Sequence, residues 1–257
     1  MSSGRVMREF PVIHAVTDTS AVLAAGFIPR ATAVMRALGP RGAVHLRSSR
    51  IQARRFYDIA LELAKVQEET GCWLIVNDRV DVAAAVGARG VQLAAHSLTI
   101  ADAVAVTPLV PVGASIHSVE EAVEAERDGA SWCVAGTVFE TPSHEGRPPA
   151  RVEFIEQVAR AVRIPVIAIG GVTPEDVQTL RKAGAHGVAT IRGAGWDADA
   201  GGPEERKHLL ETRLFSLAHP EFPEPVTRYI SAYDSESGSG RDDNADGQRR
   251  SQGAGAE

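Results

Sequence analysis

The feature that most constrains the fold of this chain is a regular alternation of short apolar runs with segments of helical periodicity. The apolar runs, rich in β-branched residues, lie at 12–16, 43–46, 73–76, 90–93, 110–114, 132–135, 165–169 and 187–191. The segments between them, such as 53–70, 120–128, 152–162 and 174–183, repeat apolar residues at helical spacing. Eight such units in about two hundred residues predict an α/β fold, a (β/α)8 TIM barrel. A doubly wound open sheet is the alternative, and the lack of a G-x-G-x-x-G segment disfavours it.

The two ends of the chain differ from this central pattern. We expect residues 1–10 to form an N-terminal extension, residues 11–219 the barrel, and residues 220–257 a tail rich in proline, glycine and serine. From about residue 231 onward the tail has few apolar residues to bury. A segment of this composition is predicted to be disordered.

Composition excludes several classes of partner. The net charge is −6 and there is no basic run, so we expect no nucleic acid partner. No apolar run is long enough to cross a membrane, and residues 1–10 lack the apolar core of a signal peptide. Cys72 and Cys133 stand in apolar segments without a pairing pattern, which is typical of reduced thiols in a cytoplasmic protein.

Polar residues gather where the predicted strands end. Active sites of TIM barrels lie at the C-terminal ends of the strands, so these residues are candidates for substrate binding. They are His45, Arg47, Asn77, Asp78, Gln92, Ser115, Thr141, Ser143 and His144. Asn77 and Asp78 have an alternative role, since either side chain can cap a helix that begins near Arg79.

His117 is the candidate catalytic base. Ser118 and Glu121 form an S-x-x-E capping box, so Ser118 is the predicted N-cap of a helix and His117 comes directly before it. The positive end of the helix dipole disfavours a charged imidazole. A neutral histidine at the mouth of a barrel can accept a proton.

Two glycine-containing loops predict a phosphate site. Gly170 and Gly171 follow the seventh predicted strand, and Thr190, Ile191 and Arg192 close the eighth. Glycine lets backbone N–H groups approach an anion closely, and arginine pairs with phosphate. TIM barrels commonly bind phosphate at the loops after these two strands.

Several motifs resemble the TenI and thiamine phosphate synthase superfamily. They are Ile13-His-Ala-Val-Thr-Asp18, Val44-His-Leu-Arg47, Val76-Asn-Asp-Arg-Val-Asp81, Gly90-Val-Gln-Leu93, Ser115-Ile-His-Ser-Val-Glu-Glu-Ala122, Gly136-Thr-Val-Phe-Glu-Thr141 and Pro165-Val-Ile-Ala-Ile-Gly-Gly171. The resemblance implies one of two activities. Thiamine phosphate synthase joins a pyrimidine diphosphate to a thiazole phosphate and needs magnesium. The TenI thiazole tautomerase makes a carboxythiazole phosphate aromatic by a metal-free proton shift, with a histidine that matches His117.

Departures from the synthase pattern favour the tautomerase branch. The lysine after the second strand is replaced by Ser49, the second magnesium carboxylate by Ser97, and a lysine after the sixth strand by His144. The sequence therefore predicts an isomerase with no metal and no cofactor, acting on a phosphorylated thiazole. The alternatives are a magnesium-dependent synthase that retains Asp78, and a non-catalytic TenI-like regulator that binds a phosphate ligand. The resemblance also implies a homo-oligomer.

Overall fold

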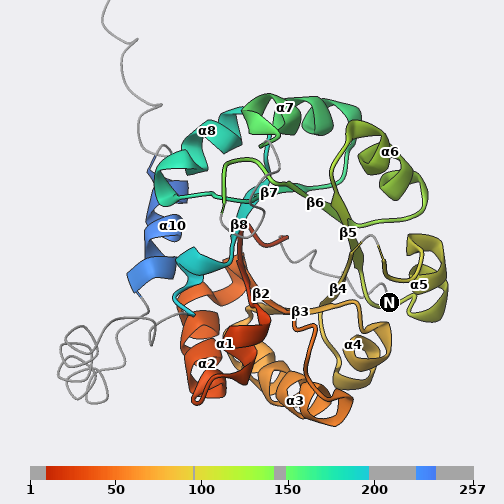
Figure 1. Cartoon of the computed structure of the whole chain (residues 1–257), viewed down its shortest axis with the longest axis vertical. Coiled ribbons are helices and arrows are strands. Elements are labelled where there is room, and N and C mark those ends of the chain that lie inside the picture. Colours follow the sequence, from red (N-terminus) through yellow and green to blue (C-terminus); the bar gives the residue numbers. More distant parts are fainter. Residues whose placement is uncertain (1–9, 95, 142–148, 197–223, 236–257) are drawn as a thin grey trace, which may run out of the picture.

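Parallel strands form a closed barrel in a computed structural model that describes residues 10–94, 96–141, 149–196 and 224–235. Each strand pairs with the next, and β8 pairs with β1 to close the sheet. Helices surround the barrel on the outside (Figure 1). This arrangement confirms the predicted TIM barrel.

The elements follow the alternation seen in the sequence. The strands are β1 (Ile13–Val16), β2 (Gly42–Leu46), β3 (Trp73–Asn77), β4 (Gly90–Leu93), β5 (Val112–Ile116), β6 (Trp132–Gly136), β7 (Val166–Ile169) and β8 (Gly187–Thr190). The helices are α1 (Thr19–Leu23), α2 (Phe27–Leu38), η1 (Gly39–Arg41), α3 (Ala53–Thr70), α4 (Val80–Val86), α5 (Ile100–Val106), α6 (Val119–Arg127), α7 (Arg151–Ala161), η3 (Pro174–Asp176), α8 (Val177–Lys182), η4 (Arg192–Ala194) and α10 (Glu224–Asp234). The strand expected at 110–114 begins and ends later than predicted. Val110 N donates to Thr107 O in a turn, and Pro111 lacks an N–H.

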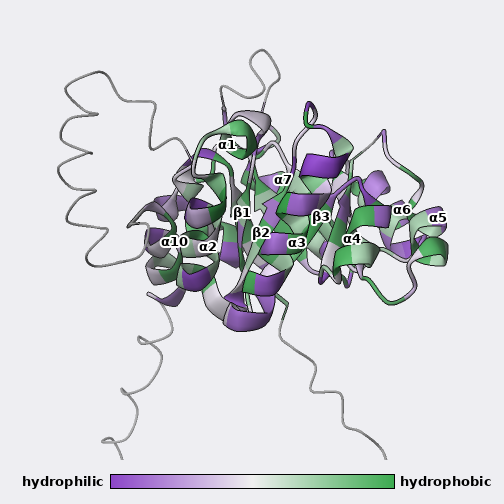
Figure 2. Cartoon of the chain, turned by 90° about the horizontal axis from the view of Figure 1, so that it is seen from below, coloured by the Kyte–Doolittle hydropathy of each residue, from purple (hydrophilic) through white to green (hydrophobic). Residues whose placement is uncertain are grey.

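Apolar side chains fill the two regions that a barrel must bury. Figure 2 shows green, apolar strands between helices whose ribbons alternate purple and green. One cluster lies between strands and helices, and a second, smaller cluster lies inside the barrel around Trp132. No helix in the described part of the chain is long and apolar enough to span a membrane.

Trp132 fills the barrel interior because two neighbouring strands present glycine to it. A Cβ atom on Gly113 would lie 2.0 Å from Trp132 Cε2, and one on Gly90 would lie 2.8 Å from Trp132 Cη2. Gly113 is also the register partner of Trp132 in the sheet. The size of the indole and the two glycines therefore complement one another.

Gly113→Ala is expected to destabilise the fold by about 3 kcal/mol, because the added methyl overlaps the indole ring. Urea unfolding measures this loss. In the double variant with Trp132→Phe, the smaller ring should recover part of it. If the two substitutions lower the free energy of unfolding additively in the double variant, the added methyl group does not overlap the indole ring.

Phe10 closes the N-terminal end of the barrel. Its ring centroid lies 5.1 Å from that of Trp132, 5.5 Å from Trp73 and 5.6 Å from His14. His186, at the entry to β8, hydrogen-bonds Phe10 O through Nε2. The last residue of the expected N-terminal extension is therefore part of the barrel, and the open mouth is at the opposite end.

The prediction of a disordered tail from residue 220 is wrong for residues 224–234, which form α10. Val226, Tyr229, Ile230 and Tyr233 recur at helical spacing and pack against the main core, with Val226 and Tyr229 buried. In Figure 1, α10 lies between α8 and α2, and it also contacts β1 and η4. The folded unit therefore extends beyond residue 219, while residues 236–257 lie outside the described part.

Candidate active site

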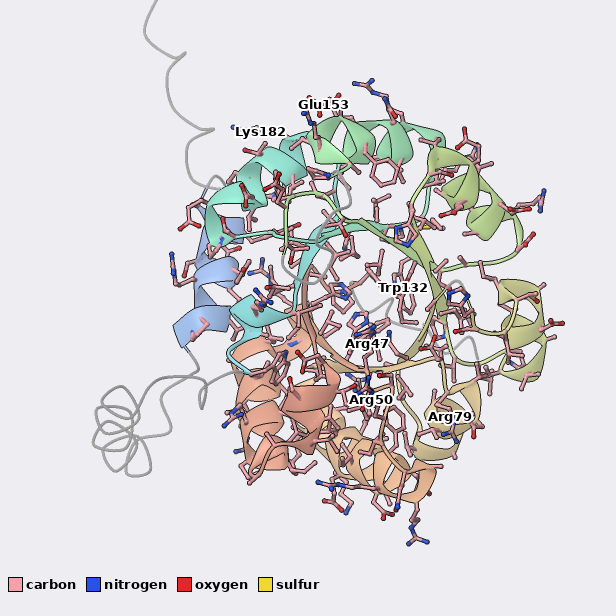
Figure 3. The ribbon with its side chains drawn as sticks, in the orientation of Figure 1. Arg47, Arg50, Arg79, Trp132, Glu153 and Lys182 are labelled. Carbon is pink, nitrogen blue, oxygen red and sulfur yellow. The ribbon has the colours of Figure 1, made fainter. Side chains whose placement is uncertain are left out.

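The candidate residues meet at one end of the barrel because all the strands run in the same direction. Arg47, Asp78, His117, Gly170 and Arg192 each follow the C-terminal end of a different strand. In Figure 3, Arg47 lies over the middle of the barrel, whereas Glu153 and Lys182 lie on the outer helices. The closed parallel barrel brings these residues to one end, and a ligand site there stays a prediction.

Arg47 presents an exposed cation on a fixed loop. Its backbone N–H donates to Thr17 Oγ1 at 2.8 Å, and Thr17 Oγ1 donates to Arg47 O at 2.9 Å. Thr17 therefore ties the loop after β2 to the end of β1. Among the described residues, neither Arg47 nor Arg192 forms an ion pair. Both guanidinium groups are free to bind an anionic ligand.

His45 does not lie at the open mouth, where the sequence placed it, but is buried inside the barrel. Its Nε2 lies 2.8 Å from His14 Nδ1, and His14 Nε2 donates to Pro11 O at 3.0 Å. Because a carbonyl only accepts, neutral His14 carries its proton on Nε2 and accepts from His45 Nε2. Burial lowers the pKa of His14 to about 4. Burial and the neighbouring His14 hold the pKa of His45 well below its usual value.

A row of polar side chains lies above the barrel interior. It consists of Asn77 and Gln92, which are buried, and Ser115, which is half-buried. Gln92 Oε1 accepts from Trp132 Nε1 at 2.7 Å, and Gln92 Nε2 donates to Ser115 Oγ at 3.1 Å. Gln92 therefore orients Ser115 rather than offering free groups of its own. Asn77 Oδ1 is buried and has no hydrogen-bond partner among the described residues. A buried acceptor without a partner suits a donor from a ligand.

His117 lies exposed at the mouth, held from two sides. Its Nδ1 donates to Gly136 O at 2.6 Å, which leaves Nε2 for a ligand. Ser118 is the N-cap of α6, as predicted, and its hydroxyl accepts from Glu121 N. The Glu121 carboxylate accepts from His117 N at 2.6 Å, one residue before the position that a standard capping box uses.

Asp78 joins the loops after β3 and β4 instead of capping α4. Its backbone has a positive φ of 63°, and its Oδ1 accepts from Ala94 N at 3.0 Å and from the Ser97 hydroxyl. The N-cap of α4 is Arg79, without a side-chain cap. The capping alternative for Asn77 and Asp78 is therefore wrong.

The described residues do not fit the two-carboxylate magnesium site that the family resemblance implies. The resemblance places the second carboxylate at position 97, where this chain has a serine, and the Ser97 hydroxyl hydrogen-bonds Asp78. In the described ranges, no group of three or more His, Cys, Asp and Glu side chains is placed to hold a metal ion. Both printed hydrogen bonds of Asp78 use Oδ1, so Oδ2 of this one carboxylate has no hydrogen-bond partner among the described residues.

Ser97→Asp is expected to create a tighter cation site. Without metal, the new carboxylate repels Asp78 and should lower the melting temperature. With millimolar Mg²⁺, the paired carboxylates bind the ion, so the melting temperature should rise several degrees more than in the native chain. Thermal unfolding with and without Mg²⁺ measures this, and Ser97→Asn is the uncharged control. Equal metal responses in all three proteins would contradict the assignment of Ser97 to the missing ligand position.

The loop after β7 (170–173, the β7 loop) requires glycine at two positions. Gly170 and Gly171 have positive φ angles of 103° and 66°. A Cβ atom on Gly170 would lie 2.4 Å from Thr137 Cγ2, and one on Gly171 would lie 2.5 Å from Glu140 O. The β7 loop therefore packs tightly on the residues that follow β6. Thr173 and Asp176 form a capping box at its end.

The loop after β8 (191–195, the β8 loop) differs in one respect from the prediction. The Thr190 side chain points away from the mouth and toward α10. Its Oγ1 accepts from Gly193 N at 3.0 Å and lies 3.4 Å from the Tyr229 hydroxyl. The side chain of Thr190 therefore shapes the β8 loop rather than meeting a phosphate. Ile191 and Arg192 do begin that loop, and Arg192 is exposed.

The remaining predicted residues lie at the edge of the described chain. Thr141 is half-buried and ends the described segment after β6. Ser143 and His144 lie outside the described residues.

A parallel barrel with polar side chains and glycine loops at the C-terminal ends of its strands belongs to the TIM-barrel class, whose ligands bind at that end. The family described as "thiamine monophosphate synthase" matches residues 13–194, and the chain belongs to this family. The thiamine-phosphate synthase of Pyrococcus abyssi is 35% identical over 188 residues, which are 72% of this chain and 91% of that protein. That of Pyrococcus furiosus is 36% identical over 186 residues, which are 72% and 87%.

A solved structure agrees with these relatives. The thiamine phosphate pyrophosphorylase from Pyrococcus furiosus superposes with a TM-score of 0.67 at 27% sequence identity. The match covers 87% of this chain and 96% of that chain.

The comparisons correct the predicted activity. The tautomerase assignment is wrong, because these relatives are named as synthases, which are transferases rather than isomerases. The prediction depended on serines at two positions, 49 and 97, whereas the family match extends over residues 13–194. The prediction considered only the absent lysines, whereas Arg47 and Arg192 also supply positive charge at the mouth.

Proposed function

We propose that this protein is a thiamine-phosphate synthase, a transferase that joins a pyrimidine diphosphate to a thiazole phosphate. The observation that carries the proposal is the family match over residues 13–194, which includes every strand and the described mouth of the barrel. The relatives cited above are named thiamine-phosphate synthase, and the matches cover most of the length of each relative.

In the proposed reaction, the thiazole nitrogen forms a bond to the methylene carbon of the pyrimidine. The bond from that carbon to the diphosphate oxygen breaks, and its electron pair leaves with the diphosphate. Charge therefore builds up on the leaving group, where fixed cations stabilise it most. Arg47, which is exposed and forms no ion pair within the described part of the chain, is placed to do this. His117 Nε2 is available to hydrogen-bond the same ligands, but no proton shift through His117 is needed.

We assign the thiazole phosphate to the β7 and β8 loops. Gly170 and Gly171 keep the β7 loop close to the barrel end, and Arg192 offers a charged partner beside it. Binding energy from this remote phosphate holds the ring in position for attack. Asn77 Oδ1, which is buried and has no hydrogen-bond partner in the described ranges, is suited to a ligand N–H group deeper in the mouth.

Magnesium enters no step of this account. The family resemblance implies the ion, but Ser97 and Asp78 do not form the two-carboxylate site described for it above. What the chain itself contributes is binding and orientation of the two phosphorylated substrates by backbone, arginine and polar groups.

Product formation tests the proposal. Purified protein is mixed with both substrates, with Mg²⁺ or EDTA, and thiamine phosphate is measured by mass spectrometry. We expect product only when both substrates are present. No product in either condition, with the substrates shown to be intact, would contradict the synthase assignment.

We infer a reducing, cytoplasmic setting, supported by Cys72 and Cys133, both free and buried. Burial raises the pKa of both thiols, that of Cys133 to about 12, so neither is a reactive thiolate. A homo-oligomer is proposed on the family resemblance alone, and sedimentation analysis tests it.

A further inference from the structure

Tyr229 of α10 connects the two loops assigned to the phosphate. Its side chain is buried, with 3% exposed. Its hydroxyl donates to Val172 O in the β7 loop at 2.9 Å and lies 3.4 Å from Thr190 Oγ1, where the β8 loop begins. One phenol oxygen therefore contacts both loops from behind.

The β8 loop is shaped around this hydroxyl. Gly193 N donates to Thr190 Oγ1, and a Cβ atom on Gly193 would lie 2.3 Å from the Tyr229 oxygen. Glycine at this position leaves the space that the phenol occupies. Burial raises the pKa of Tyr229, so the hydroxyl keeps its proton and remains a donor to Val172 O.

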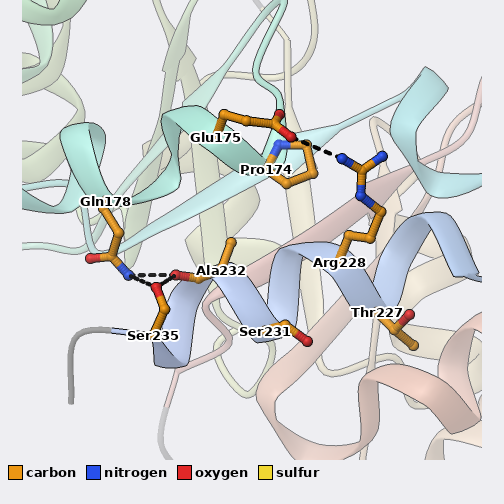
Figure 4. A pocket seen from close by; sticks show the side chains of 8 residues that line it. All are labelled: Pro174, Glu175, Gln178, Thr227, Arg228, Ser231, Ala232 and Ser235. Carbon is orange, nitrogen blue, oxygen red and sulfur yellow. Dashed lines mark hydrogen bonds and ion pairs between the residues drawn. The ribbon is translucent and has the colours of Figure 1, made fainter. Parts of the chain in front are cut away.

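The helix that carries Tyr229 is fixed independently at its C-terminal end. Arg181 donates to Tyr233 O at 2.7 Å, and Gln178 donates to Ala232 O. Arg41 forms a two-bond ion pair with Asp234 at 2.8 and 2.9 Å. Figure 4 shows Gln178 reaching α10 across the groove that separates it from η3 and α8. These contacts do not depend on the mouth, so α10 is a firm support for the phenol.

We propose that Tyr229 is a positioning residue for phosphate binding, which sets the spacing of the β7 and β8 loops so that their groups converge on the phosphate of the thiazole substrate. The inference rests on the proposed function for the identity of that substrate. Tyr229 is separated from the mouth by the loops themselves, so it acts through them and not by touching the ligand.

Tyr229→Phe removes only the hydroxyl, and Tyr233→Phe is its matched control. Tyr233 lies one turn further along α10, and its hydroxyl donates to His186 O at 3.2 Å, at the opposite end of β8. Both variants lose one tyrosine–carbonyl hydrogen bond. Only Tyr229→Phe is expected to raise the KM for thiazole phosphate, by about tenfold, with kcat and the KM for the pyrimidine diphosphate unchanged.

Calorimetric binding of thiazole phosphate separates this inference from the proposed function. If the native chain makes no product but binds the ligand, and Tyr229→Phe alone weakens binding, the positioning role stands and the synthase assignment fails. If product forms and the two variants behave alike, the positioning role is overturned. Should Tyr229→Phe fold poorly, Gly193→Ala displaces the hydroxyl from within the β8 loop and must show the same selective rise in KM. An unchanged KM in that variant would also overturn the inference.

Discussion

Gly171→Ala is expected to lower kcat/KM for the thiazole phosphate by about 100-fold, because a catalytic loop displaced by about 1 Å commonly costs that much. The new Cβ would lie 2.5 Å from Glu140 O and 2.8 Å from Phe139 Cβ, so the β7 loop has to move away from the segment after β6. Steady-state kinetics with each substrate varied in turn measures the loss. The fall in kcat/KM should be large for the thiazole phosphate and much smaller for the pyrimidine diphosphate.

Gly87→Ala is the matched control for backbone strain. Gly87 ends α4 with a φ of 71°, close to the 66° of Gly171, but no atom lies within 4 Å of its added Cβ. Both variants therefore carry the cost of about 1 kcal/mol of a left-handed alanine, but only one moves a loop at the mouth. Equal kinetics for the two variants would show that the β7 loop does not hold the phosphate.

Acid is expected to destabilise the protein by about 3 kcal/mol between pH 7.5 and pH 4 through His14 alone. The pKa of His14 lies at about 4 in the folded chain, against an ordinary value of 6.5. Its contribution to stability is therefore complete above pH 6.5 and is lost as the pH falls toward 4, since only the unfolded chain binds the proton in that range. One pKa unit is worth about 1.4 kcal/mol, and His45 shifts in the same direction.

His14→Gln is the variant that checks this dependence. Glutamine retains a donor for Pro11 O and an acceptor for His45, but it does not titrate. We expect the free energy of unfolding in urea to fall with acid by about 3 kcal/mol less in the variant than in the native chain. Parallel curves for the two proteins would mean that His14 is not held neutral by burial.

The parts of the fold that local pattern controls could be predicted from the sequence. The alternation of runs located the strands, and parallel strands in a closed barrel then brought Arg47, Asp78 and His117 to one end. The direction of a single side chain was harder to predict. Thr190 turns outward to Tyr229 because the strand alternates its faces, and His45 turns inward for the same reason.

The predicted end of the barrel at residue 219 was wrong because the composition of the long tail was considered as a whole. The apolar stripe of α10, from Val226 to Tyr233, is short and stands beside polar, glycine-rich sequence. Its stability comes from packing on the rest of the barrel, through contacts such as that of Tyr229 with Val172, and such contacts are not visible in local composition. A search for helical spacing at 226, 229, 230 and 233 would have found it.

The activity was misassigned because residue types at three positions were weighed without their surroundings. Ser97 stands where the resemblance places the second magnesium carboxylate, and in the structure its hydroxyl donates a hydrogen bond to Asp78. The family match over residues 13–194 and the names of the relatives carry more weight than the loss of one ligand.

Phosphorus NMR of one reaction mixture shows whether diphosphate release is coupled to thiamine phosphate formation, because it follows the diphosphate ester, free pyrophosphate and the phosphate monoester together. The synthase account predicts that pyrophosphate appears only when thiazole phosphate is present, in amounts equal to the thiamine phosphate formed. Gly171→Ala should slow both signals by the same factor. Release of pyrophosphate without the thiazole, or no release at all from intact substrates, would contradict the account.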